Sequence, residues 1–573
     1  MTRVRIAMAQ INTFVGDIEG NVEKIRAYLQ RAKDVGADLV LFPELTVTGY
    51  PPEDLLLKPS FLRSSVDAVR TLAPESLGLT VVVGFADVEE DVYNAAAILH
   101  DGVWVHTYHK HYLPNYAVFD EERYFDAGTT VPVFRREDVT FGVSICEDIW
   151  YPAGPPDTAA LHGGARLLLN LSASPYHDGK GRTREQMLRT RAVDNAAVVA
   201  FCNLVGGQDE LVFDGRSVVV NERGVVIARG AQFQEDFVTA DVDVGAVFRW
   251  RLHDPRRRKA ADRPLPVVDL PAPALPTNRP PLEAHVVEPL PRLAEVYRAL
   301  VLGTRDYVRK NDFDRVVIGL SGGVDSSLVA CIAADALGPE HVIGVSMPSR
   351  YTADMSNDDA AELAQNLGIQ YMRIPIESVF GSYLDVLAEP FAGTEPGVAE
   401  ENIQARIRGN YLMALSNKFG WMVLTTGNKS EMSVGYATLY GDMAGGYAVI
   451  KDVLKGLVYD LVGWRNTWDD GPVVPERVIT RPPSAELRPD QKDSDSLPPY
   501  GVLDPILQAY VVEDLSPEEI VTALDLDEAT VDRVVRMVDR AEYKRRQAPP
   551  GVRITVRAFG KDRRLPITQK YTE

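Results

Sequence analysis

A cysteine, a glutamate and a lysine in the first half of the chain could together break an amide bond. Cys146 ends the apolar run VTFGVSIC, and Glu44 follows the apolar run ADLVLFP. A free thiol with a pKa near ~8.5 is mostly protonated at neutral pH, so it needs a neighbouring base or cation. Glu44 could take the thiol proton, and Lys110 could stabilise the developing oxyanion. Taken singly, each residue also has a plainer interpretation: a core thiol, a strand-end carboxylate and a surface charge.

A serine- and glycine-rich loop in the second half of the chain could bind phosphate. The expected strand RVVIGL leads into residues 321–327, SGGVDSS, and an expected helix follows. Backbone N–H groups at a helix N-terminus favour an anion, the serine hydroxyls add donors, and Asp325 could hold magnesium. The alternative is a simple Ser/Gly turn. The chain has no G-x-x-x-x-G-K-[ST] loop and no G-x-G-x-x-G after a strand, which argues against a simple ATPase or dehydrogenase.

Two α/β scaffolds are expected to position these groups. Between residues 4 and 248, short apolar runs alternate with amphipathic stretches, which predicts a layered α/β fold. One predicted helix carries an apolar stripe at helical spacing, formed by Val22, Ile25, Leu29 and Ala32. After residue 314, strands and helices alternate again, which predicts a parallel sheet with right-handed crossovers.

A proline-rich segment separates the two scaffolds. Residues 262–291 are dense in proline, which removes backbone donors and favours extended, stiff conformations over helix or central strand. We therefore predict a linker at 262–291 between domains at 1–261 and 292–573. A second polar, proline-rich stretch, 481–501, is expected to form a loop or lid.

Composition limits the compartment and the partners. The 573-residue chain has a net charge of −20, which disfavours extended contact with nucleic acid or an anionic membrane. The three cysteines, Cys146, Cys202 and Cys331, are too few for a disulfide framework and indicate a reducing compartment. With no secretion signal and no apolar run near ~18 residues, a cytoplasmic protein is expected.

The first half resembles the nitrilase superfamily. The segments GADLVLFPELTVTGYPPEDLL, HKHYLPNYAVFDEERYF, GVSICEDIW and NLSASPY match that family in order and spacing. The resemblance implies an α-β-β-α sandwich in which Glu44 is the general base, Lys110 stabilises the oxyanion, Cys146 is the nucleophile and Glu121 supports the lysine. It also implies glutamine as the amide substrate, held by Tyr116, Ser174 and Lys180.

The loop SGGVDSS resembles the pyrophosphate-binding loop of the ATP pyrophosphatase superfamily, and later segments resemble the NAD synthetase family. Those segments are EENIQARIRGNYLMALSN, VLTTGNKSEMSVGYATLYGD, IKDVLK and EYKRRQAPP. The resemblance implies a Rossmann-like parallel sheet and assigns ATP contacts to Gly319, Leu320, Ser321, Gly322, Gly323, Val324, Asp325, Ser326, Thr426, Lys455 and Ser484. It assigns deamido-NAD contacts to Asn402, Arg406, Glu431 and Lys544, and Mg²⁺ to Asp325 and Glu431.

Together the resemblances imply a glutamine-dependent ligase that makes NAD. Its substrates would be deamido-NAD, ATP and L-glutamine, and its products would be NAD, AMP, pyrophosphate and glutamate. We hypothesise a tunnel that carries ammonia from one site to the other, and we expect a homodimer or a larger ring. The chain departs from the ammonia-dependent branch at Leu439, where that branch has lysine, and at Gly446, where it has aspartate.

Three alternatives stay open. A ligase of the same architecture could amidate another carboxylate or a nucleobase. A tRNA-modifying enzyme shares the loop, but no reactive cysteine pair and no basic balance support it. A non-catalytic scaffold is disfavoured because Glu44, Lys110 and Cys146 are all present.

Overall fold

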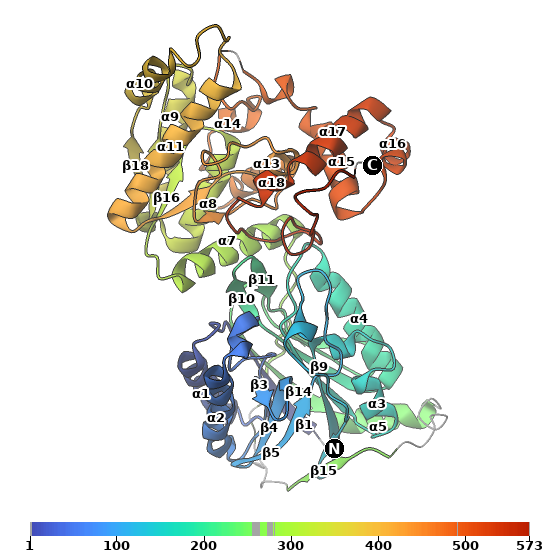
Figure 1. The fold of residues 1–573 in the computed structure, drawn as a ribbon. Helices are drawn as coiled ribbons and strands as arrows, with labels where there is room; N and C mark the ends of the chain where they lie inside the picture. The colour runs from blue at the N-terminus through green and yellow to red at the C-terminus, as the bar shows by residue number, and fades with distance from the viewer. Residues whose placement is uncertain (1–2, 255–263, 272–278, 280, 490, 572–573) are drawn as a thin grey trace. The chain divides into compact units, whose positions relative to one another are not determined.

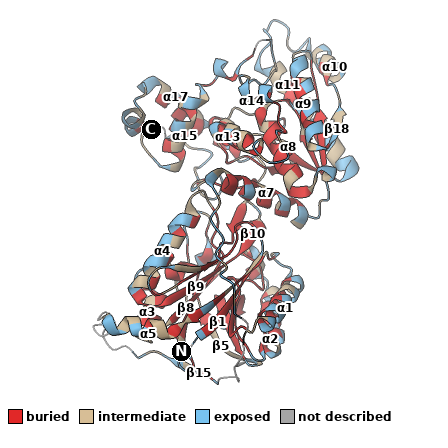
Figure 2. Cartoon of the chain, turned by 180° about the vertical axis from the view of Figure 1, so that it is seen from behind, coloured by how far each residue is buried: buried red, intermediate tan, exposed pale blue. Residues whose placement is uncertain are grey.

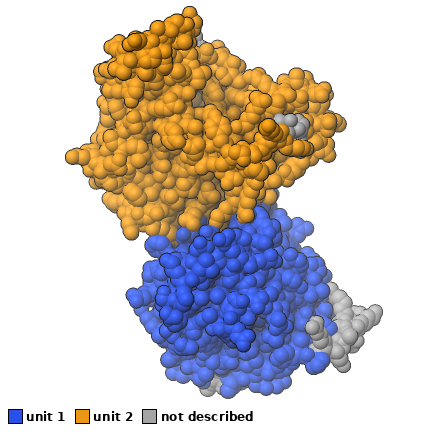
Figure 3. Space-filling view, viewed as in Figure 1, with its two compact units in different colours: residues 1–208, 212–290 blue, residues 209–211, 291–573 orange. Residues whose placement is uncertain are grey.

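The computed structural model describes residues 3–254, 264–271, 279, 281–489 and 491–571 (Figure 1). The chain divides into two compact units (Figure 3). The first comprises Met1–Gln208 and Val212–Leu290, and the second comprises Asp209–Leu211 and Pro291–Glu573. The domain boundaries at 261 and 292 stay a prediction, because residues 262, 263, 272–278 and 280 of the predicted linker lie outside the described residues.

Two sheets organise the first unit. Its strands are β1 (Arg3–Gln10), β2 (Leu39–Leu41), β3 (Thr80–Val88), β4 (Val92–His100), β5 (Val103–His109), β6 (Val133–Arg136), β7 (Val139–Ile145), β8 (Leu167–Ser172), β9 (Val198–Asn203), β10 (Val205–Gln208), β11 (Leu211–Asp214), β12 (Val218–Val220), β13 (Val226–Arg229), β14 (Asp236–Asp243) and β15 (Val267–Leu270). Its helices are α1 (Ile18–Asp34), α2 (Pro59–Leu72), α3 (Pro155–Leu161), α4 (Lys180–Asn195) and α5 (Val244–His253). The strand orders are β14-β1-β2-β3-β4-β5 and β13-β12-β9-β8-β7-β6-β15, and β10 and β11 form a separate pair.

The two large sheets pack face to face with helices outside them. Along β1, Ile6 and Met8 belong to the core between the sheets, whereas Ala7 and Ala9 belong to the core beneath α1 and α2. This alternation follows from the two-residue period of a strand, and both faces are apolar because both are covered. A third core lies between the second sheet and α3 and α4. The predicted α-β-β-α sandwich is confirmed, and Figure 2 shows buried residues concentrated in its strands.

Part of the proline-rich segment forms a strand. Within residues 262–291, β15 pairs in parallel with β6 at the edge of the second sheet, with Val267 opposite Val133. Val286 forms an isolated bridge with Arg229. Proline is tolerated beside an edge strand, because one side of that strand needs no ladder donors. A stiff extended linker was expected here, and this part of it is built into the first unit.

The second unit contains one parallel sheet of five strands. The strands are β16 (Val316–Gly319), β17 (Val342–Ser346), β18 (Gln370–Arg373), β19 (Met422–Thr425) and β20 (Tyr447–Ala448). The helices are α7 (Arg292–Lys310), α8 (Val324–Leu337), α9 (Asp354–Leu367), α10 (Glu377–Leu387), α11 (Val398–Phe419), α12 (Lys429–Val434), α13 (Lys455–Arg465), α14 (Glu476–Thr480), α15 (Tyr500–Leu507), α16 (Pro517–Leu524), α17 (Glu528–Arg540) and α18 (Glu542–Arg545). The strand order is β18-β17-β16-β19-β20, with every pair parallel.

This strand order identifies where a ligand can enter. The chain moves outward from β16 through β17 to β18 and then returns to the other side of β16 with β19. Ligands of open parallel sheets bind at such a switch point, beyond the carboxyl ends of the strands. The loop after β16 is therefore placed at the switch point, as the Rossmann-like prediction requires.

Among the helices of the described residues, none is long and apolar enough to cross a membrane.

Gly84 controls how closely the segment around Glu44 packs on β3. A Cβ atom at Gly84 would lie 2.4 Å from the Pro43 carbonyl oxygen and 2.4 Å from the Leu45 nitrogen. We predict that Gly84→Ala lowers the melting temperature, because overpacking of this kind costs about 1–3 kcal/mol. Differential scanning calorimetry measures the effect. The control is Gly381→Ala in α10, where no atom lies within 4 Å of the added Cβ, and an unchanged melting temperature for Gly84→Ala would contradict the packing argument.

Candidate active sites

The Cys146 thiol lies at a strained turn directly after β7. Cys146 begins the short 3-10 helix η4 (Cys146–Ile149), has a φ of 41° and is 3% exposed. Left-handed backbone at a residue other than glycine costs about 1–3 kcal/mol, and such residues cluster at active sites. The fold therefore holds the thiol in a conformation that a core cysteine does not need.

Asp148 ties this turn to the segment around Lys110. One of its carboxylate oxygens accepts hydrogen bonds from Ile145 N at 2.9 Å and the Tyr108 hydroxyl at 2.7 Å. The other accepts from His111 N at 3.1 Å and Tyr112 N at 3.0 Å. Because the partners come from β7, from β5 and from the residues after Lys110, this one buried side chain positions the thiol relative to the lysine.

Lys110 lies between two buried carboxylates. Its Nζ is 2.6 Å from Glu44 Oε1 and 2.7 Å from Glu121 Oε2, and all three residues are at most 5% exposed. Asn94 Nδ2 donates to Glu44 at 2.8 Å, and the Tyr50 hydroxyl donates to Glu121 at 2.9 Å. The structure thus brings together the glutamates and lysine that the sequence predicted.

Burial sets the protonation of this cluster. Burial acts to lower the pKa of Lys110, but Glu121 and Glu44 outweigh it, so that pKa is well above the ordinary value. Burial and the Glu44 charge raise the pKa of Glu121 to about 7, against the opposing effect of Lys110. Burial, followed by Glu44, also raises the pKa of the Cys146 thiol. The resting thiol is protonated, and its attack on an amide requires a base.

Two of the residues predicted to bind glutamine, Tyr116 and Lys180, interact with Glu147. The Tyr116 hydroxyl donates to Glu147 at 2.9 Å. Burial raises the pKa of Glu147, and this hydrogen bond and the charges of Lys110 and Lys180 oppose the rise. The Lys180 ammonium lies 6.0 Å from the Trp150 ring centroid. Ser174 is 2% exposed, and its neighbour Ala173 donates its N–H to Glu44 at 2.9 Å. The role of these residues in binding glutamine stays a prediction.

Glycine and three hydroxyl groups shape the loop after β16. Gly322 has a φ of 76°, and a Cβ atom there would lie 2.2 Å from the Ser356 carbonyl oxygen, so only glycine fits. The hydroxyls of Ser326 and Ser327 donate to the Gly323 carbonyl at 3.0 and 2.9 Å. Ser321 accepts from Gly323 N at 3.2 Å. The backbone N–H groups of the loop therefore continue directly into the N-terminus of α8.

A second buried lysine lies between two carboxylates beside this loop. Lys455 Nζ forms ion pairs with Asp325 and, at 3.4 Å, with Glu431. The Asn428 side chain donates to Asp325 at 2.8 Å and accepts from Glu431 N at 3.0 Å, and the Asn428 backbone N–H donates to the Glu431 carboxylate at 3.5 Å. Asn428 therefore contacts both carboxylates. Burial raises the pKa of Glu431 to about 8, with Asp325 adding to the shift and Lys455 opposing it.

The same carboxylates suit a hard divalent cation. Mg²⁺ prefers carboxylate oxygen ligands and keeps several waters. Asp325 and Glu431 already converge on one cation, the Lys455 ammonium. The donor chemistry therefore fits magnesium, provided that the ammonium moves toward phosphate when the ion enters.

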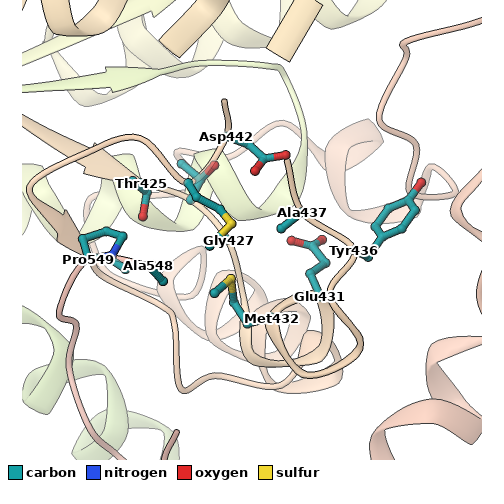
Figure 4. Close-up of a pocket in the computed structure, with 12 residues that line it drawn as sticks. Thr425, Gly427, Glu431, Met432, Tyr436, Ala437, Asp442, Ala548 and Pro549 are labelled. Atoms are coloured by element: carbon teal, nitrogen blue, oxygen red, sulfur yellow. The ribbon is translucent and has the colours of Figure 1, made fainter. Parts of the chain in front are cut away.

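A cavity of about 280 Å³ opens at the switch point. Its lining contains most of the predicted ATP residues, namely Gly319, Leu320, Ser321, Asp325, Ser326, Thr426 and Ser484. A cavity of about 80 Å³ adjoins it and shares Thr425, Thr426, Glu431 and Asp442 (Figure 4). In Figure 4 Glu431 extends into the middle of the lining residues. The larger cavity suits a nucleotide, and the smaller one suits a small group beside it.

Three of the residues predicted to bind deamido-NAD contact residues 435–439 through their side chains, whereas the Glu431 side chain pairs with Lys455. Asn402 accepts from the Thr438 hydroxyl at 2.8 Å, and Arg406 Nε donates to the Leu439 carbonyl at 3.2 Å. Lys544 Nζ donates to the carbonyls of Gly435 at 2.8 Å and Ala437 at 2.9 Å. Among the described residues, Asn402, Arg406 and Lys544 line neither cavity. Their contact with the dinucleotide stays a prediction.

The sequence did not predict the side chains that hold the predicted site residues in place. Asp148, Asn94 and Tyr50 orient the amidase cluster, and Asn428 orients the second. The signal for Asn428 is its helix-capping pattern with Glu431 at the start of α12. Asp148 likewise caps η4 locally through Ile145 N, but its bonds to Tyr108, His111 and Tyr112 join residues far apart in sequence. The contacts of Asn94 and Tyr50 are also distant, and no local pattern marks them.

Asp148→Asn tests the positioning of the thiol. We predict that amide hydrolysis slows at least about a hundredfold. The NH₂ group of asparagine would face N–H or O–H donors whose hydrogen bonds the Asp148 carboxylate accepts, and this conflict would move the turn that carries the thiol. Hydrolysis of a primary amide such as glutamine is measured by glutamate release, with circular dichroism confirming the fold. Asp138→Asn, an exposed change in the β6–β7 turn, is the control. Wild-type hydrolysis by Asp148→Asn would rule out the positioning role.

Comparisons with known proteins identify a separate family for each half of the chain. The carbon-nitrogen hydrolase family matches residues 5–252, and the NAD synthase family matches residues 296–548. The glutamine-dependent NAD(+) synthetase of Thermotoga maritima is 54% identical over 576 residues, covering 100% of both chains. That of Aquifex aeolicus is 48% identical, covering 99% of this chain and 100% of its own.

A solved structure extends this likeness to three dimensions. The glutamine-dependent NAD+ synthetase from Acinetobacter baumannii, in complex with ADP, has a TM-score of 0.75 and 41% identity, covering 99% of this chain and 98% of that one. The resemblances that the motifs predicted are confirmed over the whole chain. The chain belongs to the family of the glutamine-dependent NAD(+) synthetases.

Proposed function

We propose that this chain makes NAD by amidating the nicotinate carboxylate of deamido-NAD, with ATP as the activating substrate and glutamine as the source of ammonia. The observation that carries the proposal is one chain with both a buried Glu44–Lys110–Cys146 cluster and a phosphate-type loop at a sheet switch point. Membership of the family supports the acceptor. Neither cluster by itself would account for a ligase that uses an amide donor.

The first unit releases ammonia through a thioester. Cys146 Sγ attacks the side-chain carbonyl carbon of glutamine while its proton passes to Glu44. The Lys110 ammonium stabilises the oxyanion, and Glu121 keeps that ammonium in place. The C–N bond then breaks, and the nitrogen leaves as ammonia with the proton from Glu44. Water attacks the thioester, gives a proton to Glu44, and leaves glutamate and the free thiol.

Tyr116, Ser174 and Lys180 would hold the amino-acid end of glutamine. Lys180 supplies a cation for the α-carboxylate, and Tyr116 reaches Glu147 beside the thiol. Ser174 follows Ala173, whose N–H binds Glu44. This placement would orient the amide carbon toward Cys146, since a fixed near-attack geometry lowers the barrier.

The second unit joins the ammonia to the acceptor. The nicotinate oxygen attacks the α-phosphorus of ATP, the bond to the bridging oxygen breaks, and pyrophosphate leaves. Ammonia then attacks the acyl carbon of the adenylate, AMP leaves, and a proton is released. The amides of residues 321–327 and the ammonium of Lys455 would hold the phosphates. A tunnel for ammonia and a homo-oligomeric assembly stay predictions.

Mg²⁺ completes the proposed nucleotide site. Asp325 and Glu431 would hold the ion, which supplies charge neutralisation for the phosphate oxygens. Before the ion enters, these carboxylates share Lys455. Exchange of the ammonium for the ion would free Lys455 to bind phosphate.

The products discriminate this reaction from its alternatives. With deamido-NAD, ATP, Mg²⁺ and [amide-¹⁵N]glutamine, we predict NAD, AMP and glutamate in equal amounts, with ¹⁵N in the nicotinamide. Chromatography with mass spectrometry measures all three. An enzymatic ammonia scavenger should leave the ¹⁵N transfer intact. Formation of ADP in place of AMP would refute the adenylate, and glutamate without NAD would favour a ligase with another acceptor.

A further inference from the structure

Carboxylates outnumber basic residues in the lining of the nucleotide cavity. Four carboxylate residues contribute to it, namely Asp325, Glu431, Asp442 and Glu486. Among its described lining residues, Arg408 is the only basic one. Lys455 is occupied by two carboxylates and is not part of the lining. Arg408 is therefore the one cation on this wall that a ligand can meet directly.

Arg408 has little to bind in the protein itself. It lies on α11, and its Nε donates to the Met347 carbonyl at 3.0 Å, its one hydrogen bond within the described residues. No described carboxylate lies within the 4.0 Å of an ion pair, whereas Arg465 pairs with both Asp335 and Asp470. Burial lowers the pKa of Arg408 to about 10, with Glu486 opposing the shift. Arg408 is partly exposed. A guanidinium has five N–H donors, so the described residues leave most of its capacity for a ligand.

Apolar residues line the cavity beside Arg408 on α11 and around its partner Met347, with Glu486 as the carboxylate that acts on Arg408. Met347 and Pro348 follow β17, and Ala405, Gly409 and Leu412 lie on the same helix as Arg408. All five line the cavity. The serine hydroxyls and loop amides that suit phosphate come instead from residues 321–327, after β16. The cavity thus has a polar side for phosphate and an apolar side that carries one flat cation.

We propose that Arg408 is the residue that recognises the base of ATP, with its guanidinium plane stacked on the purine ring. The proposal rests on the proposed function, which makes ATP the occupant. A purine is flat and neutral, fits an apolar wall, and attracts a desolvated guanidinium through its π face. The bond from Nε to the Met347 carbonyl restrains the guanidinium at the cavity wall. A phosphate contact would place the charged end of ATP against the apolar wall.

The test compares ligands with and without phosphate. Adenosine, AMP and ATP are titrated into the full-length protein by isothermal titration calorimetry. The variants are Arg408→Met, which keeps a long apolar stem, and Arg408→Lys, which keeps the charge without the plane. Arg540→Met, an exposed arginine of α17 outside the cavity, is the matched control. Melting curves and circular dichroism establish that each variant is folded.

The expected result is an equal loss of affinity for all three ligands, about ten- to thirtyfold, for both Arg408 variants. Arg540→Met should bind as the wild type does. A loss confined to AMP and ATP that lysine restores would show a phosphate contact and overturn the stacking. Unchanged affinities would overturn any role for Arg408. Failure of the wild type itself to bind ATP would instead refute the proposed function.

Discussion

The buried ammonium of Lys110 between Glu44 and Glu121 is the constraint on which the first unit depends. Removing one partner from such a pair costs about 3–5 kcal/mol, because the remaining charge stays buried. The fold meets this requirement with donors from several elements: Asn94 on β4 and the N–H of Ala173 after β8 bind Glu44, and Tyr50 binds Glu121. The cluster therefore specifies how the two sheets and their loops come together.

The second unit uses the same arrangement for another purpose. Lys455 is also a buried lysine shared by two carboxylates, Asp325 and Glu431. In the reaction proposed for the first unit, the ammonium would stay in place to stabilise an oxyanion. In the second, proposed exchange with Mg²⁺ would release it toward phosphate. The difference lies in access, because Asp325 and Glu431 line a cavity that a nucleotide can enter, whereas Glu44 and Lys110 are at most 1% exposed.

Local patterns predicted the layers and the loop well. Strands that are buried on both faces have apolar sequences, and the backbone conformation at residue 322 requires glycine. Family resemblance supplied Glu121, which no local pattern identifies. The strand β15 was not predicted, since edge pairing with β6 depends on a segment more than a hundred residues away. Asp148 and Arg408 were missed for the same reason: their importance comes from contacts between distant elements.

In the proposed reaction, two separate sites of one chain act in turn. Their division of labour is tested by NAD formation by wild type and Cys146→Ala with deamido-NAD, ATP and Mg²⁺, using glutamine or ammonium as the nitrogen donor. The wild type is expected to use both donors and the variant only ammonium, because its second site is intact. NAD formation from glutamine by Cys146→Ala at the wild-type rate would show that Cys146 is not needed to release ammonia.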